Sequence, residues 1–304
     1  MNAPLIEKIR TGYGGFSKGQ RRIIDYLTEH PEDAAFMTAK RLGEQTGVSE
    51  STVIRFAMLK GFDGYPDLQS QLQTMLESRL STLQRAELAR RIPEENAVRE
   101  VLEADIRNLQ KTQEMSDPVL FSEAVSWLCD GLHVYLAGSG SARPLLIFFG
   151  NYLSYLRENV ILLPDSETDA RAQMARVSPA DVCFGISFPR YSAATADLLG
   201  FAAERGAAVI ALTDRKDSPA ALVADTVLLA RSGMVSLADS LTAPLSLLNA
   251  LLVAAANRFG AGADRSLARL EEIFEENGVY IAPDSQEAGP DASERRPAWR
   301  EGQQ

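Results

Sequence analysis

The stretch "TGVSESTVIRFAMLKGF", residues 46–62, predicts a helix with two different faces. Its apolar residues recur at helical spacing and form one face: Val48, Val53, Phe56 and Leu59. Ser49 stands where a helix N-cap is expected, and Gly61 is placed to end the helix. The start of the other face carries short polar side chains and Arg55, which points to a polar partner.

A second helix precedes this stretch. "TAKRLGEQ" predicts a helix that starts at Thr38 and ends before Gly47, so that a turn of about three residues joins the two helices. Gly47 supplies the positive φ that such a turn needs. Gly43 has no side chain and lets the helices approach, while Val53 packs back onto the first helix. The pattern therefore predicts a helix-turn-helix unit.

The polar start of the second helix is the candidate DNA-contacting surface. In a helix-turn-helix, this part of the recognition helix meets base edges and phosphates, and its N–H groups favour a phosphate. A solvated face on an ordinary helical hairpin is the alternative. The residues expected at a double-stranded DNA operator are Thr38, Lys40, Ser49, Glu50, Ser51, Thr52, Arg55, Lys60 and Tyr65.

Charge is spread unevenly along the 304 residues, of which 45% are hydrophobic. That length suits one or two cores. The net charge is −10, yet residues 1–92 hold 13 Lys+Arg against 11 Asp+Glu, and the remainder holds 18 against 30. Most of the acidity therefore lies outside the helix-turn-helix unit, which leaves a local DNA-binding surface compatible with an acidic chain.

Several protein classes are excluded by what the sequence contains. Two cysteines outside a CxxC spacing and two histidines argue against a zinc site or a disulfide framework, so we expect no metal and no cofactor. The N-terminus "MNAPLIEKIRTGYGG" lacks the apolar core of a signal peptide. No apolar run reaches the roughly 18 residues of a membrane span. We therefore expect a cytoplasmic protein with no membrane contact.

The pattern changes after residue 131. Short apolar runs at 133–138, 160–164, 181–187, 207–214 and 224–230 alternate with helical segments at 142–157, 192–205 and 237–258. Such alternation predicts a doubly wound parallel sheet. The expected organisation is an all-α helix-turn-helix domain (1–80), a helical connector (81–123), an α/β domain (124–263) and a disordered polar tail (283–304).

Both halves resemble one family. "AKRLGEQTGVSESTVIRFAMLKGFDGYPDLQ" resembles the N-terminal domain of RpiR-type bacterial transcriptional regulators, whose pattern is "GVSxxTVxRFxxxLGFxGYxxL". Lys60 here replaces the leucine of that pattern. "HVYLAGSGSARPL" and "DVCFGISFPRYSAATADLLGFAAERGAAVIALTDRKDSPAALVAD" resemble parts of a sugar-isomerase-type (SIS) domain, a doubly wound α/β unit that binds phosphosugars. The resemblance covers most of residues 1–260.

The resemblance implies an anion site on two loops. Each loop follows a strand and opens a helix at the carboxyl end of the sheet, where open α/β folds bind ligands. Serines that only cap their helices are the alternative. The expected ligand-binding residues are Ser139, Gly140, Ser141, Arg143, Glu167, Ser187, Arg190, Ser192 and Thr195.

The second loop departs from the family pattern Ser-x-Ser-Gly-x-Thr. Here it reads Ser187-Phe188-Pro189-Arg190-Tyr191-Ser192, so Pro189 replaces a hydroxyl donor and Arg190 replaces a glycine. Proline also lacks a backbone N–H. Arg190 and Arg143 could instead donate charge-assisted hydrogen bonds to a phosphate or carboxylate, or pair with nearby acidic groups.

The expected function is a transcriptional regulator, not an enzyme, whose SIS-like domain senses a small anionic effector such as a sugar phosphate. A homodimer or homotetramer is expected, with the connector at 66–128 changing the arrangement of its DNA-binding domains. One alternative is a phosphosugar isomerase, with His133 or Glu167 as its acid–base candidates. The other is a helical interaction module without a DNA role. The apolar segment 237–258 predicts a helix buried nearly all round, in the core or at a subunit interface.

Overall fold

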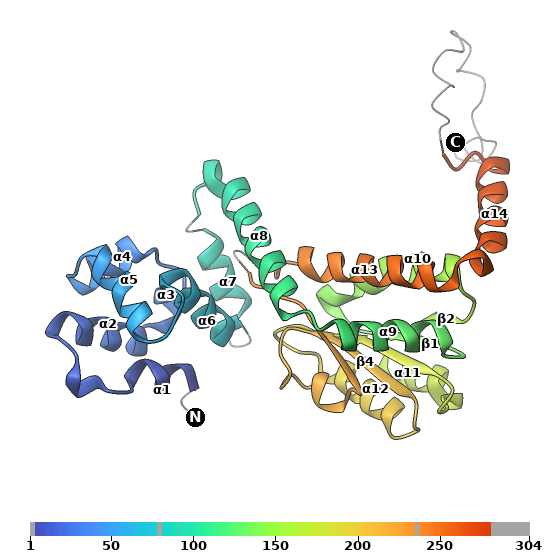
Figure 1. Cartoon of the computed structure of the whole chain (residues 1–304), viewed down its shortest axis with the longest axis horizontal. Helices are drawn as coiled ribbons and strands as arrows, with labels where there is room; N and C mark the ends of the chain where they lie inside the picture. Colours follow the sequence, from blue (N-terminus) through green and yellow to red (C-terminus); the bar gives the residue numbers. More distant parts are fainter. Residues whose placement is uncertain (1–3, 78–80, 91, 235–236, 281–304) are drawn as a thin grey trace, which may run out of the picture.

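The computed structural model describes residues 4–77, 81–90, 92–234 and 237–280. The tail predicted at 283–304 lies outside the described residues. Figure 1 shows a helical N-terminal part and an α/β part, with helices α7 and α8 between them. The all-α and α/β classes predicted for the two halves are confirmed.

The N-terminal part is built from short helices around one apolar cluster. They are α1 (Pro4–Arg10), η1 (Tyr13–Gly15), α2 (Lys18–Glu29), α3 (Pro31–Ala34), α4 (Ala39–Thr46), α5 (Glu50–Leu59) and α6 (Tyr65–Glu77). Ser17 caps α2 in a reciprocal capping box with Gln20. The buried cluster includes Ile23, Ile24, Leu27, Leu42, Val53, Phe56, Leu68 and Leu72. This cluster fixes α4 and α5 against the rest of the domain.

The connector consists of α7 (Thr82–Ala89), η2 (Glu94–Asn96) and α8 (Ala97–Met115), and α9 (Pro118–Asp130) follows. Asp117 caps α9, and Pro118 occupies its first position, where the missing N–H of proline is tolerated. Ala124, Val125 and Leu128 of α9 belong to the core of the α/β part. The domain boundary expected at 123/124 therefore falls inside a helix that packs on the sheet.

The sheet has five parallel strands in the order β2-β1-β3-β4-β5. They are β1 (Val134–Ala137), β2 (Val160–Leu162), β3 (Val182–Ile186), β4 (Ala208–Thr213) and β5 (Thr226–Leu229). All five predicted strands are confirmed. Strands β1, β3 and β4 are buried along their whole length, as expected for a sheet covered on both faces.

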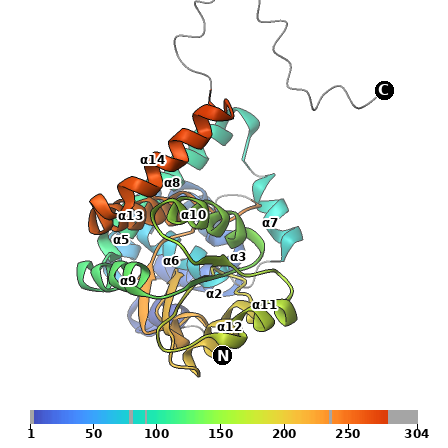
Figure 2. The same cartoon turned by 90° about the vertical axis from the view of Figure 1, so that its right-hand side faces the viewer.

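Helices cover both faces of the sheet (Figures 1 and 2). One face packs against α9, α10 (Arg143–Leu156) and α13 (Thr242–Phe259), with Phe149 and Phe184 in contact at its centre. The other packs against α11 (Glu167–Gln173) and α12 (Ala193–Ala203). The α/β part also contains single-turn helices: η3 (Gly140–Ala142), η4 (Met174–Arg176) and η5 (Ala221–Val223).

Helix α13 is buried on one side within this chain. Leu248 and Leu251 face the core, whereas Ser246, Asn249 and Ala250 are exposed and Val253 is 62% exposed. Burial of the exposed side at a subunit interface stays a prediction. Helix α14 (Ala261–Glu276) follows and projects away from the body in Figure 1. Within the described ranges no single helix meets the length and hydropathy of a membrane span; α13 and α14 do so only as a pair bent by 110°.

Candidate functional site

The turn between α4 and α5 is tight. It comprises Gly47, Val48 and Ser49, and Gly47 has φ 62°, as the sequence predicted. A Cβ atom on Gly43 would lie 2.8 Å from the backbone oxygen of Val48. The N–H of Val48 donates to the Gly43 carbonyl at 2.8 Å. Gly43 and Gly47 therefore set the angle at which α5 is presented.

The first turn of α5 carries a connected polar group. Ser49 Oγ accepts a hydrogen bond from the Thr52 N–H at 3.3 Å and lies 2.9 Å from Ser51 Oγ and 2.8 Å from Thr52 Oγ1. Arg55 Nε donates to the Ser51 carbonyl at 3.3 Å. Ser49, Ser51 and Arg55 are exposed, and Thr52 is half-buried. Ser49 is a helix cap, while Ser51 and Arg55 are free to meet an outside partner.

The predicted residues around this group have different roles. Thr38 caps α4, because its Oγ1 accepts from the Arg41 N–H at 3.2 Å. Lys40 and Glu50 are exposed. Arg22 of α2 was not predicted, yet its Nη2 donates to the Gly47 carbonyl at 2.9 Å and places a cation beside the turn. The basic run "QRRIID" was the available signal for it.

Two predicted DNA contacts are wrong. Lys60 is buried: its Nζ donates to the carbonyls of Thr11 and Lys8 and lies 4.3 Å from the ring centroid of Phe16, and burial lowers its pKa. Tyr65 is also buried, donates its hydroxyl to the Met37 carbonyl at 2.7 Å and has a pKa raised by burial. Both side chains hold the domain together and do not reach the DNA-facing surface.

The first loop of the α/β part starts at the carboxyl end of β1. Strand β1 lies between β2 and β3, so the chain reverses its direction of winding between β1 and β3. A Cβ atom on Gly138 would lie 2.7 Å from Leu146 Cδ1 and 3.0 Å from the Ile186 carbonyl oxygen. Because glycine lacks this atom, the loop can lie close against the end of β3. Ser139 makes no helix-capping bond, and Gly140 and Ser141 are exposed in η3.

The second loop follows β3 and has an unusual backbone. Arg190, which replaces the family's glycine, has φ 65° and lies in the left-handed region that glycine favours. Its Nη1 donates to Thr82 Oγ1 of the connector at 3.1 Å. Phe188 and Pro189 are buried. The loop thus has a left-handed turn at Arg190, while Phe188 and Pro189 are packed inside and Arg190 reaches α7.

The hydroxyl groups of this loop are largely engaged or covered. Ser192 Oγ accepts from the Thr195 N–H at 3.2 Å and caps α12, so the capping alternative holds for Ser192. Ser187 and Thr195 are buried. A ligand can reach these two side chains only after a rearrangement of the loop.

The two charged residues predicted at this edge have protein partners. Arg143 Nη1 donates to the Leu163 carbonyl at 2.8 Å and lies 3.2 Å from Asp165 Oδ1. Glu167 forms an exposed ion pair with Arg171 at 2.9 Å. Arg143 therefore joins the start of α10 to the loop after β2, close to Ser139 in the sequence.

One buried carboxyl group at this edge was not predicted. Asp214 follows β4, and its Oδ1 accepts from the Tyr191 hydroxyl at 2.8 Å. Its Oδ2 has no hydrogen-bond partner among the described residues. Burial raises the pKa of Asp214, although the bond from Tyr191 opposes this. The pair ties the second loop to the end of β4.

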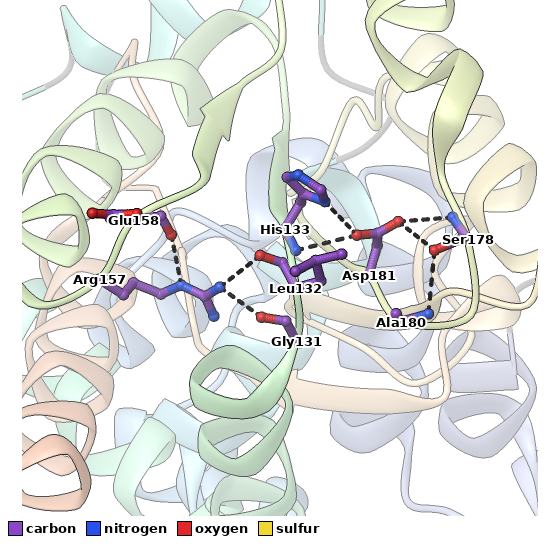
Figure 3. Close-up of polar contacts among 8 residues, drawn as sticks. All are labelled: Gly131, Leu132, His133, Arg157, Glu158, Ser178, Ala180 and Asp181. Atoms are coloured by element: carbon purple, nitrogen blue, oxygen red, sulfur yellow. Dashed lines mark hydrogen bonds and ion pairs between the residues drawn. The ribbon is translucent and has the colours of Figure 1, made fainter.

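The opposite edge of the sheet carries His133 (Figure 3). His133 Nδ1 lies 2.7 Å from Asp181 Oδ1, and Asp181 Oδ2 accepts from the Ser178 N–H and hydroxyl, each at 2.8 Å. Burial alone would raise the pKa of Asp181, but the hydrogen bonds from His133 and Ser178 lower it below its usual range. His133 joins the starts of β1 and β3 and lies away from the two loops, which removes it as an acid–base candidate there.

Within the described residues, no cluster of three His, Cys, Asp or Glu side chains is arranged to hold a metal ion.

Arg157, also in Figure 3, donates to the carbonyls of Gly131 and Leu132 at 2.6 and 3.0 Å. It neutralises the end of α9 and is a structural cation.

Comparison with known proteins connects these two sites. Residues 3–79 match the helix-turn-helix domain of the rpiR family, and residues 128–254 match the SIS domain. The transcriptional regulator HexR of Pseudomonas aeruginosa is 24% identical over 210 residues, which cover 69% of this chain and 73% of HexR. Other relatives are likewise named as helix-turn-helix transcriptional regulators.

Solved structures agree. The sugar isomerase domain of an RpiR transcription factor from Sphaerobacter thermophilus is 32% identical, with a TM-score of 0.53 over 59% of this chain and 99% of that one. Vibrio vulnificus NanR, solved with ManNAc-6P, is 20% identical, with a TM-score of 0.55 over 91% of this chain and 100% of that one, and shares the fold. A tight helix-turn-helix joined to a five-stranded SIS sheet thus places this chain in the RpiR family of DNA-binding transcriptional regulators.

Proposed function

We propose that this regulator binds a small anionic metabolite, with a sugar phosphate as the expected class, and that the ligand changes its affinity for an operator. The observation that carries the proposal is the pair of loops after β1 and β3, where the sheet reverses its winding. Ser139 and Ser141 stand at the first loop, and Ser187 stands buried at the second, where it would contact a ligand only after that loop rearranges. Helix N-termini at both loops favour a phosphate. NanR, with the same fold, was solved with a phosphosugar.

The DNA side of the proposal uses α5. Ser51, Thr52 and Arg55 would contact bases or phosphates, while Ser49 holds the helix start. The remaining exposed residues around the turn would lie beside the sugar-phosphate backbone of the DNA: Arg22, Thr38, Lys40 and Glu50. Lys60 and Tyr65 are not part of this surface.

Communication between the sites would run through the segment after β5, residues 231–234 and 237–242. Its Gly233 carbonyl accepts from Asn108 Nδ2 at 2.9 Å, and the Arg231 N–H donates to Thr112 Oγ1 at 2.8 Å, both on α8. Met234 is buried in the apolar cluster of the N-terminal domain. A ligand that favours one position of this segment would therefore also favour one position of the DNA-binding domain.

Dimerisation would use the groove between α8 and α13. This groove has a volume of about 430 Å³ and is lined by Ile106, Leu109, Ser246, Leu247 and Ala250, among others. Helix α13 carries no charged residue before Arg258, although the chain is strongly acidic. A second copy could approach this uncharged strip without repulsion and set two α5 helices roughly 34 Å apart.

The test measures DNA affinity and its response to ligands. A duplex selected by the purified protein from a random pool would be titrated with wild type, Arg55→Ala and the control Leu83→Ala, by fluorescence anisotropy. Leu83 is exposed on α7, away from α5. Arg55→Ala should weaken binding by about 5- to 160-fold, the range for one good base contact, and Leu83→Ala should not.

The same duplex then serves to test effectors. Hexose phosphates, N-acetylhexosamine phosphates, the unphosphorylated sugars and inorganic phosphate would each be added to the wild type and to Ser139→Ala. A phosphorylated sugar should change the Kd for DNA in the wild type and less in the variant. Failure of every phosphorylated sugar would reject this effector class, and aldose–ketose conversion in the same samples would favour an isomerase instead.

A further inference from the structure

The recognition helix α5 has an apolar part on its exposed side. Ile54 is 38% exposed, and Met58 and Leu59 are each 61% exposed. The helical pattern had placed Leu59 on the packed face, and the structure contradicts this. Of these three side chains on the ten-residue helix, Ile54 and Met58 are four residues apart and lie side by side, so that they form one small exposed apolar patch.

The geometry of α5 shows which surface these residues belong to. At about 100° per residue, Ser51, Arg55 and Met58 fall within roughly 60° of one another around the helix axis. Ile54 and Leu59 lie on either side of that line, and the buried residues Val53, Phe56 and Ala57 lie opposite. Met58 is therefore the next side chain along the surface that begins with Ser51 and Arg55.

We infer that Met58, with Ile54 beside it, reads the 5-methyl groups of thymines in the major groove. Apolar side chains contact this methyl group, which no other standard base carries in the groove. Methionine suits the role because its flexible thioether chain adapts to a small apolar target. Arg55, between them in the sequence, would supply a charged contact to the same groove. The inference rests on DNA binding through α5 as proposed above.

The contact is tested by a cycle that removes each partner separately. The selected duplex, roughly 25 base pairs to include two half-sites one turn apart, is remade with deoxyuridine at one thymine position at a time. Deoxyuridine keeps the base pairing and lacks only the methyl group. Kd is measured for wild type, Met58→Ala, Met58→Leu and the control Leu83→Ala, which removes an equally exposed apolar side chain from α7.

At one or two thymines, deoxyuridine should weaken wild-type binding by about fourfold, which corresponds to ~0.8 kcal/mol for one buried methyl group. The same replacement should have no further effect in Met58→Ala, and should retain its effect in Met58→Leu and Leu83→Ala. Because Met58 is exposed, these variants should unfold with the wild-type midpoint.

Two failures are distinguishable. If no duplex is retained by folded wild type, DNA binding through α5 fails, and the methyl contact fails with it. If a duplex is retained but deoxyuridine costs wild type and Met58→Ala the same at every thymine, the methyl contact alone is rejected. If Met58→Ala instead changes the oligomeric state measured by sedimentation, a second copy of the chain covers this apolar surface and the inference is wrong.

Discussion

The ion pair between Arg85 of α7 and Asp239 gives a quantitative test of how the two domains are joined. Arg85 Nη1 lies 2.7 Å from Asp239 Oδ1, and the two side chains are 4% and 9% exposed. Arg85→Met removes the cation and leaves the buried Asp239 carboxylate without this partner, which costs about 3–5 kcal/mol for a buried pair of this kind. For a unit of 150–250 residues each kcal/mol lowers Tm by about 2–4 °C, so Arg85→Met should lower Tm by about 6–20 °C.

A double-mutant cycle separates the pair from general damage to packing. Arg85→Met, Asp239→Asn and the combined variant would be followed by calorimetry. The combined variant should be destabilised by less than the sum of the two single variants, by about 1–3 kcal/mol, because it contains no unpaired buried charge. In the DNA assay, the two single variants should also respond less to an effector, since the segment after β5 is loosened from α7.

The reasoning would be refuted by small, additive effects. If both single variants unfold within about 1 °C of wild type, the pair is solvated and contributes no more than a surface ion pair. If the destabilisation is large but strictly additive, the loss comes from packing around each residue and the two charges do not interact.

Three further outcomes are expected. Gly43→Ala should lower stability by about 1–3 kcal/mol and weaken DNA binding, because the added Cβ would lie 2.8 Å from the Val48 oxygen; urea unfolding and anisotropy measure both. Asp181→Asn should destabilise the α/β domain above pH ~4, because the lowered folded-state pKa of Asp181 stabilises the wild type only while the carboxylate is ionised. As the pH falls below that value, the difference in unfolding free energy between the variant and the wild type should shrink. Urea midpoints measured from pH 7 to pH 3 check this. Lys60→Met should lose the bonds to the carbonyls of Lys8 in α1 and of Thr11 just after it, and should expose α1 to faster hydrogen exchange, with α12 as the unaffected reference.

The strands and the tight turn were predictable because they depend on short stretches of sequence. The five apolar runs were long enough and bounded clearly enough to give all five strands. The roles of Gly43 and Gly47 were predictable because the turn needs positions without a side chain, and the structure places both where a Cβ is unfavourable.

What failed depended on neighbours distant in the sequence. The local sequence pattern does not reveal that Lys8 of α1 accepts a hydrogen bond from Lys60, or that the Met37 carbonyl accepts one from Tyr65 at the start of α6. Lys60 and Tyr65 carry polar groups, but these groups are satisfied inside the domain. The composition of α13 likewise could not show which side of the helix faces the core and which side is exposed within one chain. Each error is one of tertiary environment, not of secondary structure.

Met234 has a consequence for how the chain is made. It is buried in the same apolar cluster as Leu76 and Leu88, although it follows β5 in the sequence. A ribosome that has finished α7 must still add more than a hundred residues before Met234 emerges, which takes on the order of 10 s at ordinary rates of synthesis. The core of the DNA-binding domain is therefore completed only after the α/β sheet has been synthesised, so that nascent chains gain a finished DNA reader and its sensor almost together.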